Sequence, residues 1–342
     1  APPNKVYEYY SMVMDAMPDP NLHIAHFHVT RGWGLANVLS TTVRMPRSRP
    51  SWPIAVKSMS RRSGLVGDSA CALNEELTLE INLTATRMIA SVAKGSGVRH
   101  FIFASTCSVY GASDQKLDER SELRPVSLYA RSKIASEKVL LNMADDHFSP
   151  VILRFSTIYG LSGRPRFDLV VNLLSAKAVV EKEITIFGGE QWRPFLHVDD
   201  AAQAITLVLE APFRLVRNQI FNVGSNLQNF TIDQVGEIIH QQVPEAEIVR
   251  KEDVTDLRNY WVDFTKIDKI LKFTPAWTLD LGVKQVIEAV RSGKVADYKD
   301  AMYSNIKFLK QEGIYLLTSN ESSWALDLLN GDYSGVAFQD EA

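Results

Sequence analysis

The strongest constraint on the fold is a regular alternation of short apolar runs with stretches of helical periodicity, which begins at Asn74. The apolar runs predict buried strands over residues 101–104, 151–155 and 219–223. The periodic stretches predict helices over residues 74–94, 128–144, 199–209, 232–241 and 280–292. Strands that alternate with helices form parallel pairs, so the sequence predicts an α/β fold with a doubly wound parallel sheet and helices on both faces. Ligands in such sheets bind beyond the carboxyl ends of the strands, and the functional residues are expected there.

Composition and charge exclude several classes of protein. Of the 342 residues, 46% are hydrophobic and 23% are charged, and no apolar run is long enough to span a membrane. The formal net charge of −3 argues against a nucleic-acid-binding surface. The two cysteines, Cys71 and Cys107, cannot form a disulfide framework, and no ligand spacing indicates a metal site. Reduced thiols are typical of the cytosol, so a cytoplasmic location is expected.

One segment departs from this average composition. No acidic residue stands between Asp19 and Asp68, where the overall frequency would give about five or six. Residues 30–64 are instead rich in arginine, serine and proline, and most of them lack helical or strand periodicity. We interpret 30–64 as an atypical, poorly ordered insert, and less readily as a phosphate- or nucleic-acid-binding loop, because Trp52 is its only aromatic residue after Trp33.

A hydroxyl-rich turn, Ser105 to Gly111, follows directly from the run 101–104, and a loop is expected from there to residue 125. In the first turns of the next helix, Tyr129 and Lys133 stand four residues apart and therefore share one face. An ammonium one turn away favours the phenolate form of the tyrosine, so Lys133 is expected to lower the pKa of Tyr129 from its ordinary value of about 10. The sequence thus predicts a general acid/base pair, with Thr106 as a second hydroxyl that shares the substrate proton. Tyr-x-x-x-Lys also occurs on ordinary amphipathic helices, and it is the preceding strand and turn that favour catalysis.

Four motifs in a fixed order resemble those of one family. They read FIFASTCSVYG over 101–111, PVSLYARSK over 125–133, LRFSTIYG over 153–160 and FGGEQWRPFLHVDD over 187–200. The chain thereby resembles the extended short-chain dehydrogenase/reductases, specifically the NAD-dependent sugar-nucleotide epimerase/dehydratase family. The resemblance implies a Rossmann-like NAD-binding domain, a smaller substrate domain and a C-terminal extension. Their expected bounds are 1–160 with 196–225 for the first, 161–195 with 226–295 for the second, and 296–342 for the third.

The resemblance also implies roles for individual residues. Tyr129 corresponds to the catalytic base, Lys133 to its partner and Thr106 to the assisting hydroxyl. NAD is the implied cofactor, with Asn82, Ala104, Ser105, Tyr129, Lys133 and Phe155 as its binding residues. A nucleotide-diphosphate sugar is the implied substrate, with Ser108, Asn172, Arg193 and Arg258 as its binding residues. The two guanidinium groups suit a diphosphate, because each can donate paired, charge-assisted hydrogen bonds.

Plainer interpretations remain open for several of these residues. Asn82 could equally be a polar helix residue that faces solvent. Each of the two arginines, taken alone, could be a solvated or ion-paired surface group. His197, on an apolar run, is expected to be structural. The resemblance further implies a homodimer, with the helices over 74–94 and 128–144 as the candidates for its interface.

The sequence also departs from the family pattern. Cys107 and Ser108 stand where dehydratases carry an acidic pair, which favours epimerisation or plain oxidoreduction over loss of water. Thr157 stands where many relatives have asparagine, which leaves the contact to the sugar ring open.

A larger departure concerns the start of the fold. The sequence has no G-x-x-G-x-x-G motif to hold the cofactor's pyrophosphate. With residues 22–29 aligned to the family's third strand, the first two strands are missing and the insert replaces the fourth. A shifted reading frame between about Thr30 and Gly64 would produce such a change of composition. Two classes of function follow: an NAD-dependent epimerase that works through a keto intermediate, or a catalytically impaired member that binds a nucleotide sugar or a protein partner.

Overall fold

The structure is a computed structural model, and it describes residues 23–26, 42–45, 65–251 and 258–313. The expectations for the insert and for the missing first strands therefore lie outside the described residues, apart from two short strands. Within the described residues, no helix has the length and apolar character needed to cross a membrane.

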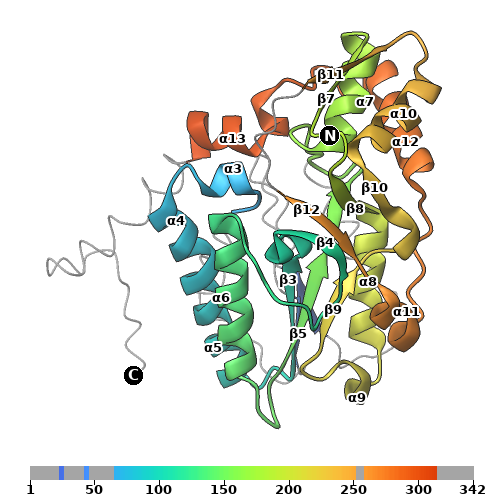
Figure 1. Cartoon of the computed structure of the whole chain (residues 1–342). Coiled ribbons are helices and arrows are strands. Elements are labelled where there is room, and N and C mark those ends of the chain that lie inside the picture. The colour runs from blue at the N-terminus through green and yellow to red at the C-terminus, as the bar shows by residue number, and fades with distance from the viewer. Residues whose placement is uncertain (1–22, 27–41, 46–64, 252–257, 314–342) are drawn as a thin grey trace, which may run out of the picture.

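Strands and helices alternate along most of the chain (Figure 1). The strands are β1 His23–His26, β2 Thr42–Met45, β3 His100–Thr106, β4 Ala112–Leu117, β5 Ser149–Phe155, β6 Thr157–Tyr159, β7 Glu183–Phe187, β8 Trp192–His197, β9 Ile220–Val223, β10 Asn229–Thr231, β11 Glu247–Lys251 and β12 Asn259–Val262. The helices are α3 Asp68–Cys71, α4 Glu75–Leu79, α5 Ala85–Gly95, α6 Leu128–Asn142, α7 Val170–Val180, α8 Val198–Glu210, α9 Phe213–Val216, α10 Ile232–Gln242, α11 Thr265–Leu271, α12 Leu279–Arg291 and α13 Asn305–Phe308. The predicted strands and helices are all confirmed, with ends that move by a few residues.

The predicted helix over 74–94 shows how local sequence sets the ends of an element. Asn74 caps its start, because its side-chain oxygen accepts a hydrogen bond from the Leu77 backbone N–H at 2.9 Å. A π-helical turn joins α4 to α5, and the helix ends at Gly95. Gly97 follows with a φ of +78°, a conformation that glycine adopts without strain.

The main sheet has the strand order β1-β2-β3-β5-β9. β3, β5 and β9 are parallel, as predicted, and Thr106 lies opposite Phe155 where two of them end. The other edge of the sheet adds two antiparallel strands that were not expected, because β2 pairs antiparallel with β3 and β1 antiparallel with β2. The edge of β3 presents backbone N–H and C=O groups that an extended segment of either direction can satisfy, so this pairing needs no parallel crossover.

Side chains of β3 alternate between two apolar layers. Phe101 and Phe103 pack with α5 and α6 on one face of the sheet. Ile102 packs on the other face, in a core that includes α8 residues such as Ala204 and Val208. Helices on both faces of the parallel strands make this a doubly wound α/β sheet.

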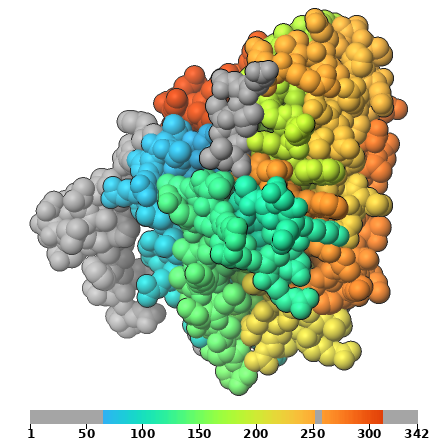
Figure 2. Space-filling model, viewed as in Figure 1, coloured from blue at the N-terminus to red at the C-terminus, as the bar shows by residue number. Residues whose placement is uncertain are grey.

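A second apolar core lies beyond the carboxyl ends of the main strands. It joins β7 and β8 to the helices α7, α10 and α12, which Figure 1 shows together at one end of the molecule. In the space-filling view, residues of the β3–α6 connection lie at the centre of the face shown, next to α6 (Figure 2). The domain division made from the sequence stays a prediction. The core around the main sheet also includes Tyr260, Phe264 and Phe273, which lie in the range assigned to the substrate domain.

The loop after the hydroxyl-rich turn differs from expectation, and the C-terminal extension has a defined place in the fold. The loop expected over 111–125 contains β4, which pairs parallel with β12, about 150 residues later in the chain. Sequence pattern could not show this pairing because β4 reads ASDQKL and is mostly exposed. The described part of the C-terminal extension packs on the body of the protein: Asn305 Nδ2 donates to the Val66 carbonyl at 2.9 Å, and its Oδ1 accepts from Arg164 at 2.8 Å.

Candidate functional site

The hydroxyl-rich turn begins where β3 ends. Thr106 is the last residue of the strand, and its hydroxyl oxygen accepts a hydrogen bond from the Ser108 backbone N–H at 3.1 Å. The Thr106 hydroxyl also donates to the Ser108 hydroxyl at 3.1 Å. Gly111 ends the turn with a φ of +72°, and a Cβ there would lie 1.8 Å from the Arg124 carbonyl oxygen. Only glycine allows this close passage, so both hydroxyls are fixed at the carboxyl edge of the sheet.

The helix α6 brings Tyr129 and Lys133 to the same edge. Ser127 caps α6 by accepting from the Ala130 backbone N–H at 3.1 Å, which places Tyr129 in its first turn. Both the tyrosine and the lysine are 8% exposed. The Lys133 ammonium donates to the Ala104 carbonyl at 2.9 Å and lies 5.8 Å from the centre of the Tyr129 ring. The structure therefore brings Thr106, Tyr129 and Lys133 together, as predicted.

The electrostatics of this pair differ from the prediction. Burial raises the pKa of Tyr129, and the nearby carboxylate of Asp68 raises it further, while the guanidinium of Arg166 and a hydrogen bond from Thr106 act in the opposite direction. The expected lowering of this pKa is not the net result, because the cost of burying a phenolate is the largest contribution and raises the pKa, while the Lys133 ammonium is bonded to a backbone carbonyl. Burial lowers the pKa of Lys133 itself to about 8. Tyr129 is thus a neutral phenol at neutral pH in this state.

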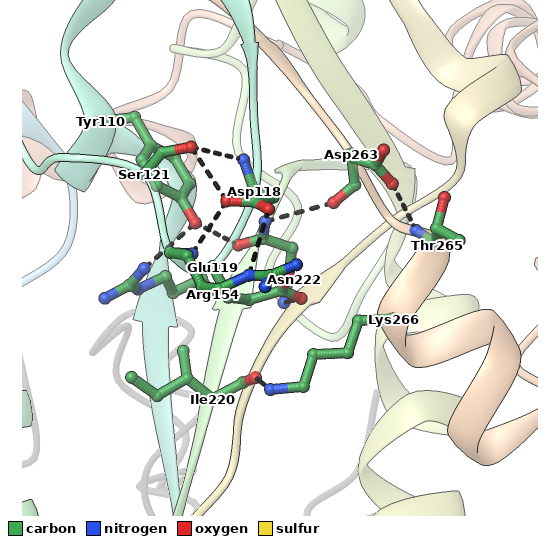
Figure 3. Close-up of polar contacts among 11 residues, drawn as sticks. Tyr110, Asp118, Glu119, Ser121, Arg154, Ile220, Asn222, Asp263, Thr265 and Lys266 are labelled. Carbon is green, nitrogen blue, oxygen red and sulfur yellow. Dashed lines mark hydrogen bonds and ion pairs between the residues drawn. The ribbon is translucent and has the colours of Figure 1, made fainter.

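A buried ion pair fixes α6 against the sheet. Glu137, one turn beyond Lys133, pairs with Arg154 of β5 at 2.7 Å, and both side chains are 3% exposed. Glu137 also accepts a hydrogen bond from the hydroxyl of Ser105, the residue before Thr106. Figure 3 shows the Tyr110 hydroxyl between Arg154 and Asn222, which it contacts at 3.0 and 2.8 Å. These bonds tie the carboxyl ends of β3, β5 and β9 together beneath the site.

Of the remaining residues predicted on the cofactor side, Asn82, Ser105 and Phe155 are buried and Ala104 is partly buried. Asn82 is 2% exposed, which excludes the solvent-facing alternative. Its amide accepts from the Leu65 backbone N–H at 2.8 Å, donates to the Leu65 carbonyl at 3.0 Å, and reaches the Ser132 hydroxyl on α6 at 3.2 Å. Phe155, at the end of β5, is 4% exposed and packs in the core below the site.

On the predicted substrate side, Ser108 and Arg193 meet at one aromatic ring. The Tyr260 hydroxyl lies 3.5 Å from the Ser108 hydroxyl, and the Arg193 guanidinium lies 5.5 Å from the centre of the Tyr260 ring. Arg193 is 5% exposed and donates to the Trp192 carbonyl at 2.8 Å and to the Gln191 side chain at 3.1 Å. A series of hydroxyl groups, on Thr106, Ser108 and Tyr260, thus leads to the guanidinium of Arg193. The burial of Arg193 excludes its interpretation as a surface group.

Arg258 and Asn172 are engaged with the protein. One guanidinium nitrogen of Arg258 pairs with the Asp68 carboxylate at 2.6 Å. The Asn172 amide accepts from the Gly160 backbone N–H at 3.0 Å and donates to the carbonyls of Gly160 and Arg166 at 3.1 and 2.9 Å. Asn172 therefore shapes the backbone that carries Arg166 toward Tyr129.

His197 and the two cysteines behave as expected. His197 is completely buried, stacks on Trp277 with ring centres 3.9 Å apart, and lies 3.0 Å from the Gln285 side chain, so its role is structural. Cys71 and Cys107 are free and buried, and burial raises the pKa of both thiols. Within the ranges that the structure describes, no group of three or more His, Cys, Asp or Glu residues could hold a metal ion.

Sequence reasoning did not find five charged or hydroxyl-bearing residues of the site: Asp68, Arg166, Tyr260, Glu137 and Arg154. Two of them carried a signal. Glu137 continues the four-residue spacing of Tyr129 and Lys133 on one helix face, and Arg154 interrupts an apolar strand, where a buried charge requires a partner. The other residues had none, because their partners are distant in sequence.

Comparisons with known proteins point to one family. Residues 63–224 match the model of the NAD dependent epimerase/dehydratase family. A curated protein of Bacillus subtilis described as an uncharacterized UDP-glucose epimerase, YtcB, is 30% identical over 62% of this chain and 66% of its own length. A UDP-glucuronate 4-epimerase of Thermodesulfobacterium geofontis is 28% identical over 70% of this chain and 76% of its own length. The chain thus spans just under two thirds of the first of these relatives.

A solved structure extends the similarity to three dimensions. MoeE5, in complex with UDP-glucuronic acid and NAD, superposes with a TM-score of 0.60 at 26% identity, over 67% of this chain and 77% of its own. The Rossmann-like fold expected from the sequence is confirmed. Residues 63–224 thus carry the features of the NAD-dependent epimerase/dehydratase family, which is a family of extended short-chain dehydrogenase/reductases, and the chain is similar to relatives of this kind beyond that segment.

Proposed function

We propose that this chain is a member of the NAD-dependent epimerase/dehydratase family, and that it is an NAD-dependent epimerase that acts on a nucleotide-diphosphate sugar. One observation carries the proposal: a continuous line of polar groups runs from Tyr129 through Thr106 and Ser108 to Tyr260 and Arg193. It joins a proton-transferring end at the sheet edge to a buried cation at the other end. A sugar with a diphosphate needs both, at two separated points.

The residues at the sheet edge fit the nicotinamide-ribose end of NAD. The Lys133 ammonium is buried beside the Tyr129 ring and donates to the Ala104 carbonyl; because an ammonium has three N–H donors, it can also donate to ribose hydroxyls. Ala104, Ser105 and Phe155 line the strand ends, and the bonded amide of Asn82 holds the segment at Leu65 in place. When bound, NAD supplies the hydride acceptor and donor. The part of the chain that would hold the rest of the cofactor falls largely outside the described residues.

The chain's own residues handle the proton. Tyr129 holds its proton as a phenol in this state, because burial disfavours the phenolate. Added positive charge beside the ring would lower its pKa and allow it to accept the proton of a sugar hydroxyl. The Thr106 hydroxyl, already bonded to Ser108, can share that proton. Lys133 stabilises the phenolate through its charge and keeps the ring in place.

The substrate side supports a diphosphate. Arg193 is buried and donates to a carbonyl and to an amide oxygen. Burial raises the pKa of Tyr260, and the charges of Arg258 and Arg193 both act against this rise, so both guanidinium groups lie near its hydroxyl. Ser108 would contact the sugar, and Asn172 would shape the pocket through Gly160 and Arg166.

Epimerisation is favoured over dehydration by the residues after Thr106. Dehydration needs a general acid and a general base beside the sugar. The two residues after Thr106 carry a thiol, on Cys107, and a hydroxyl, on Ser108, instead of acidic groups. The Cys107 thiol is completely buried, donates to the Arg154 carbonyl at 3.2 Å and has a raised pKa, so it cannot take that role.

The second candidate is an impaired member that binds a nucleotide sugar or a protein partner without turnover. The missing glycine-rich motif and the Asp68 carboxylate on Arg258 favour it. Absorbance and mass spectrometry of the purified chain would show whether NAD is bound, and UDP-glucose and UDP-glucuronic acid are the first substrates to test. Bound NAD with turnover supports the epimerase; nucleotide-sugar binding without either supports the impaired member.

Tyr129→Phe tests the chemistry. It keeps the ring and removes the titrating oxygen, so turnover should fall by about 10²–10⁴. Tyr298→Phe is the matched control, because it removes a tyrosine hydroxyl that bonds Glu181 outside the site. Unchanged turnover in Tyr129→Phe would contradict the assignment of the base.

We further propose a homodimer through the α4–α6 helices and a cytoplasmic location. Leu79, Met88 and Val92 expose 37%, 51% and 42% of their surface on α4 and α5, and a second copy of the chain could cover them. Sedimentation equilibrium of the full chain measures the oligomeric state, and a monomer at micromolar concentration would contradict the dimer.

A further inference from the structure

The ion pair between Arg258 and Asp68 joins two distant parts of the fold. Arg258 immediately precedes β12, and Asp68 begins α3, which Figure 1 shows beside the start of β12. Their nitrogen and oxygen are 2.6 Å apart, and the two side chains are 29% and 23% exposed. Partial burial makes this contact stronger than a solvent-exposed ion pair.

The same carboxylate also contacts the start of α6. The other oxygen of Asp68 accepts a hydrogen bond from the hydroxyl of Ser127, the residue that caps the helix. Tyr129 lies two residues later, and the negative charge of Asp68 raises its pKa. Asp68 therefore links a guanidinium of the substrate side to the helix that carries the proposed base.

The position of Asp68 is that of an anion in a cationic site. Arg258 lies near Tyr260, because burial raises the pKa of this tyrosine and the charges of Arg258 and Arg193 both act against the rise, and the Tyr260 ring lies against the Arg193 guanidinium. Arg166, which pairs with Asp168 at 2.9 Å, also lies near, because its guanidinium reaches within 3.1 Å of a Cβ built at Gly67, next to Asp68. A carboxylate among these arginines occupies the place that a phosphate group would take.

We propose that Asp68 gates the nucleotide-diphosphate site: its carboxylate holds Arg258 until a phosphate of the substrate replaces it. This inference rests on the proposed function, since it assumes that Arg258 meets the diphosphate. A diphosphate carries more charge and more acceptor oxygens than one carboxylate, so it can displace Asp68 from the guanidinium where a weaker anion cannot. Asp68 is thus a specificity-determining residue that acts through Arg258.

Binding of UDP to the purified full chain, measured by isothermal titration calorimetry without added NAD, tests the gate. Asp68→Asn keeps an acceptor for Ser127 and removes the competing charge, so the Kd for UDP should fall about tenfold. Asp146→Asn is the matched control, since it neutralises a carboxylate paired with Arg217 at 2.8 Å, and it should leave the Kd unchanged. Asp68→Glu, which restores the charge, should return the Kd toward the wild-type value.

A double-mutant cycle separates the gate from a structural role of Asp68. In an Arg258→Met background, Asp68→Asn should no longer change the Kd for UDP, because the guanidinium that Asp68 pairs with is absent. An equal effect with and without Arg258 would overturn the proposal. If Asp68→Asn does not fold by circular dichroism, Asp68→Ser is the second neutral variant for the same comparison.

The outcomes distinguish the gate from the proposed function. Tight UDP binding by the wild type with no gain in the folded neutral variant overturns the gate and leaves the epimerase intact. UDP binding only in the neutral variant supports the gate. If neither form binds UDP, the gate is overturned, and the epimerase is then judged by bound NAD and by the Tyr129→Phe comparison.

Discussion

Glu137→Gln should destabilise the fold far more than an ordinary loss of charge. Glu137 and Arg154 make two contacts, at 2.7 and 3.1 Å, and both side chains are 3% exposed. Glutamine keeps an oxygen that can accept from Ser105, but it leaves the Arg154 guanidinium buried without a counter-charge. Removing one partner of such a pair costs about 3–5 kcal/mol, a large part of the total stability of about 5–15 kcal/mol that is typical of a domain.

Urea denaturation, followed by tryptophan fluorescence and circular dichroism, measures this cost. Glu137→Met combined with Arg154→Met removes both charges, and we expect it to be less destabilised than Glu137→Gln alone. Asp146→Asn, which breaks an exposed pair with Arg217 whose side chains are 41% and 88% exposed, should cost less than about 1 kcal/mol. A loss in Glu137→Gln no greater than in this control would refute the reasoning.

Two further predictions concern the site and the turn behind it. Burial lowers the pKa of Lys133 to about 8, whereas its value in the unfolded chain is about 10.4. Between these pH values the unfolded chain binds more protons than the folded chain, so the stability of the wild type rises with pH. In urea titrations across this window the wild type should gain about 2–3 kcal/mol over Lys133→Met, and no difference would contradict the burial of this charge. Gly160→Ala should lower the free energy of unfolding by at least about 2 kcal/mol, and with it the thermal midpoint, because φ is +99° and the new Cβ would lie 2.3 Å from His197 Nε2. Gly163→Ala, with open space around the new Cβ, should unfold at the same temperature as the wild type.

The sequence by itself determined the repeating elements and the proposed catalytic group. Phe101 to Ala104 read as a buried strand because apolar residues on both faces need helices on both sides, and β3 has them. Thr106, Tyr129 and Lys133 were found because a strand end and a four-residue helix spacing are local features that hold in any α/β sheet.

Only the tertiary structure decided what these residues meet. The pairing of β4 with β12, the antiparallel edge of the main sheet and the contact of Asp68 with Arg258 all join segments whose local sequence shows no preference for one another. The direction of the Tyr129 pKa shift also depended on the whole fold. Spacing along α6 gave the distance to Lys133, but burial and the charges of Asp68 and Arg166, contributed by other segments, decide which protonation state the site favours.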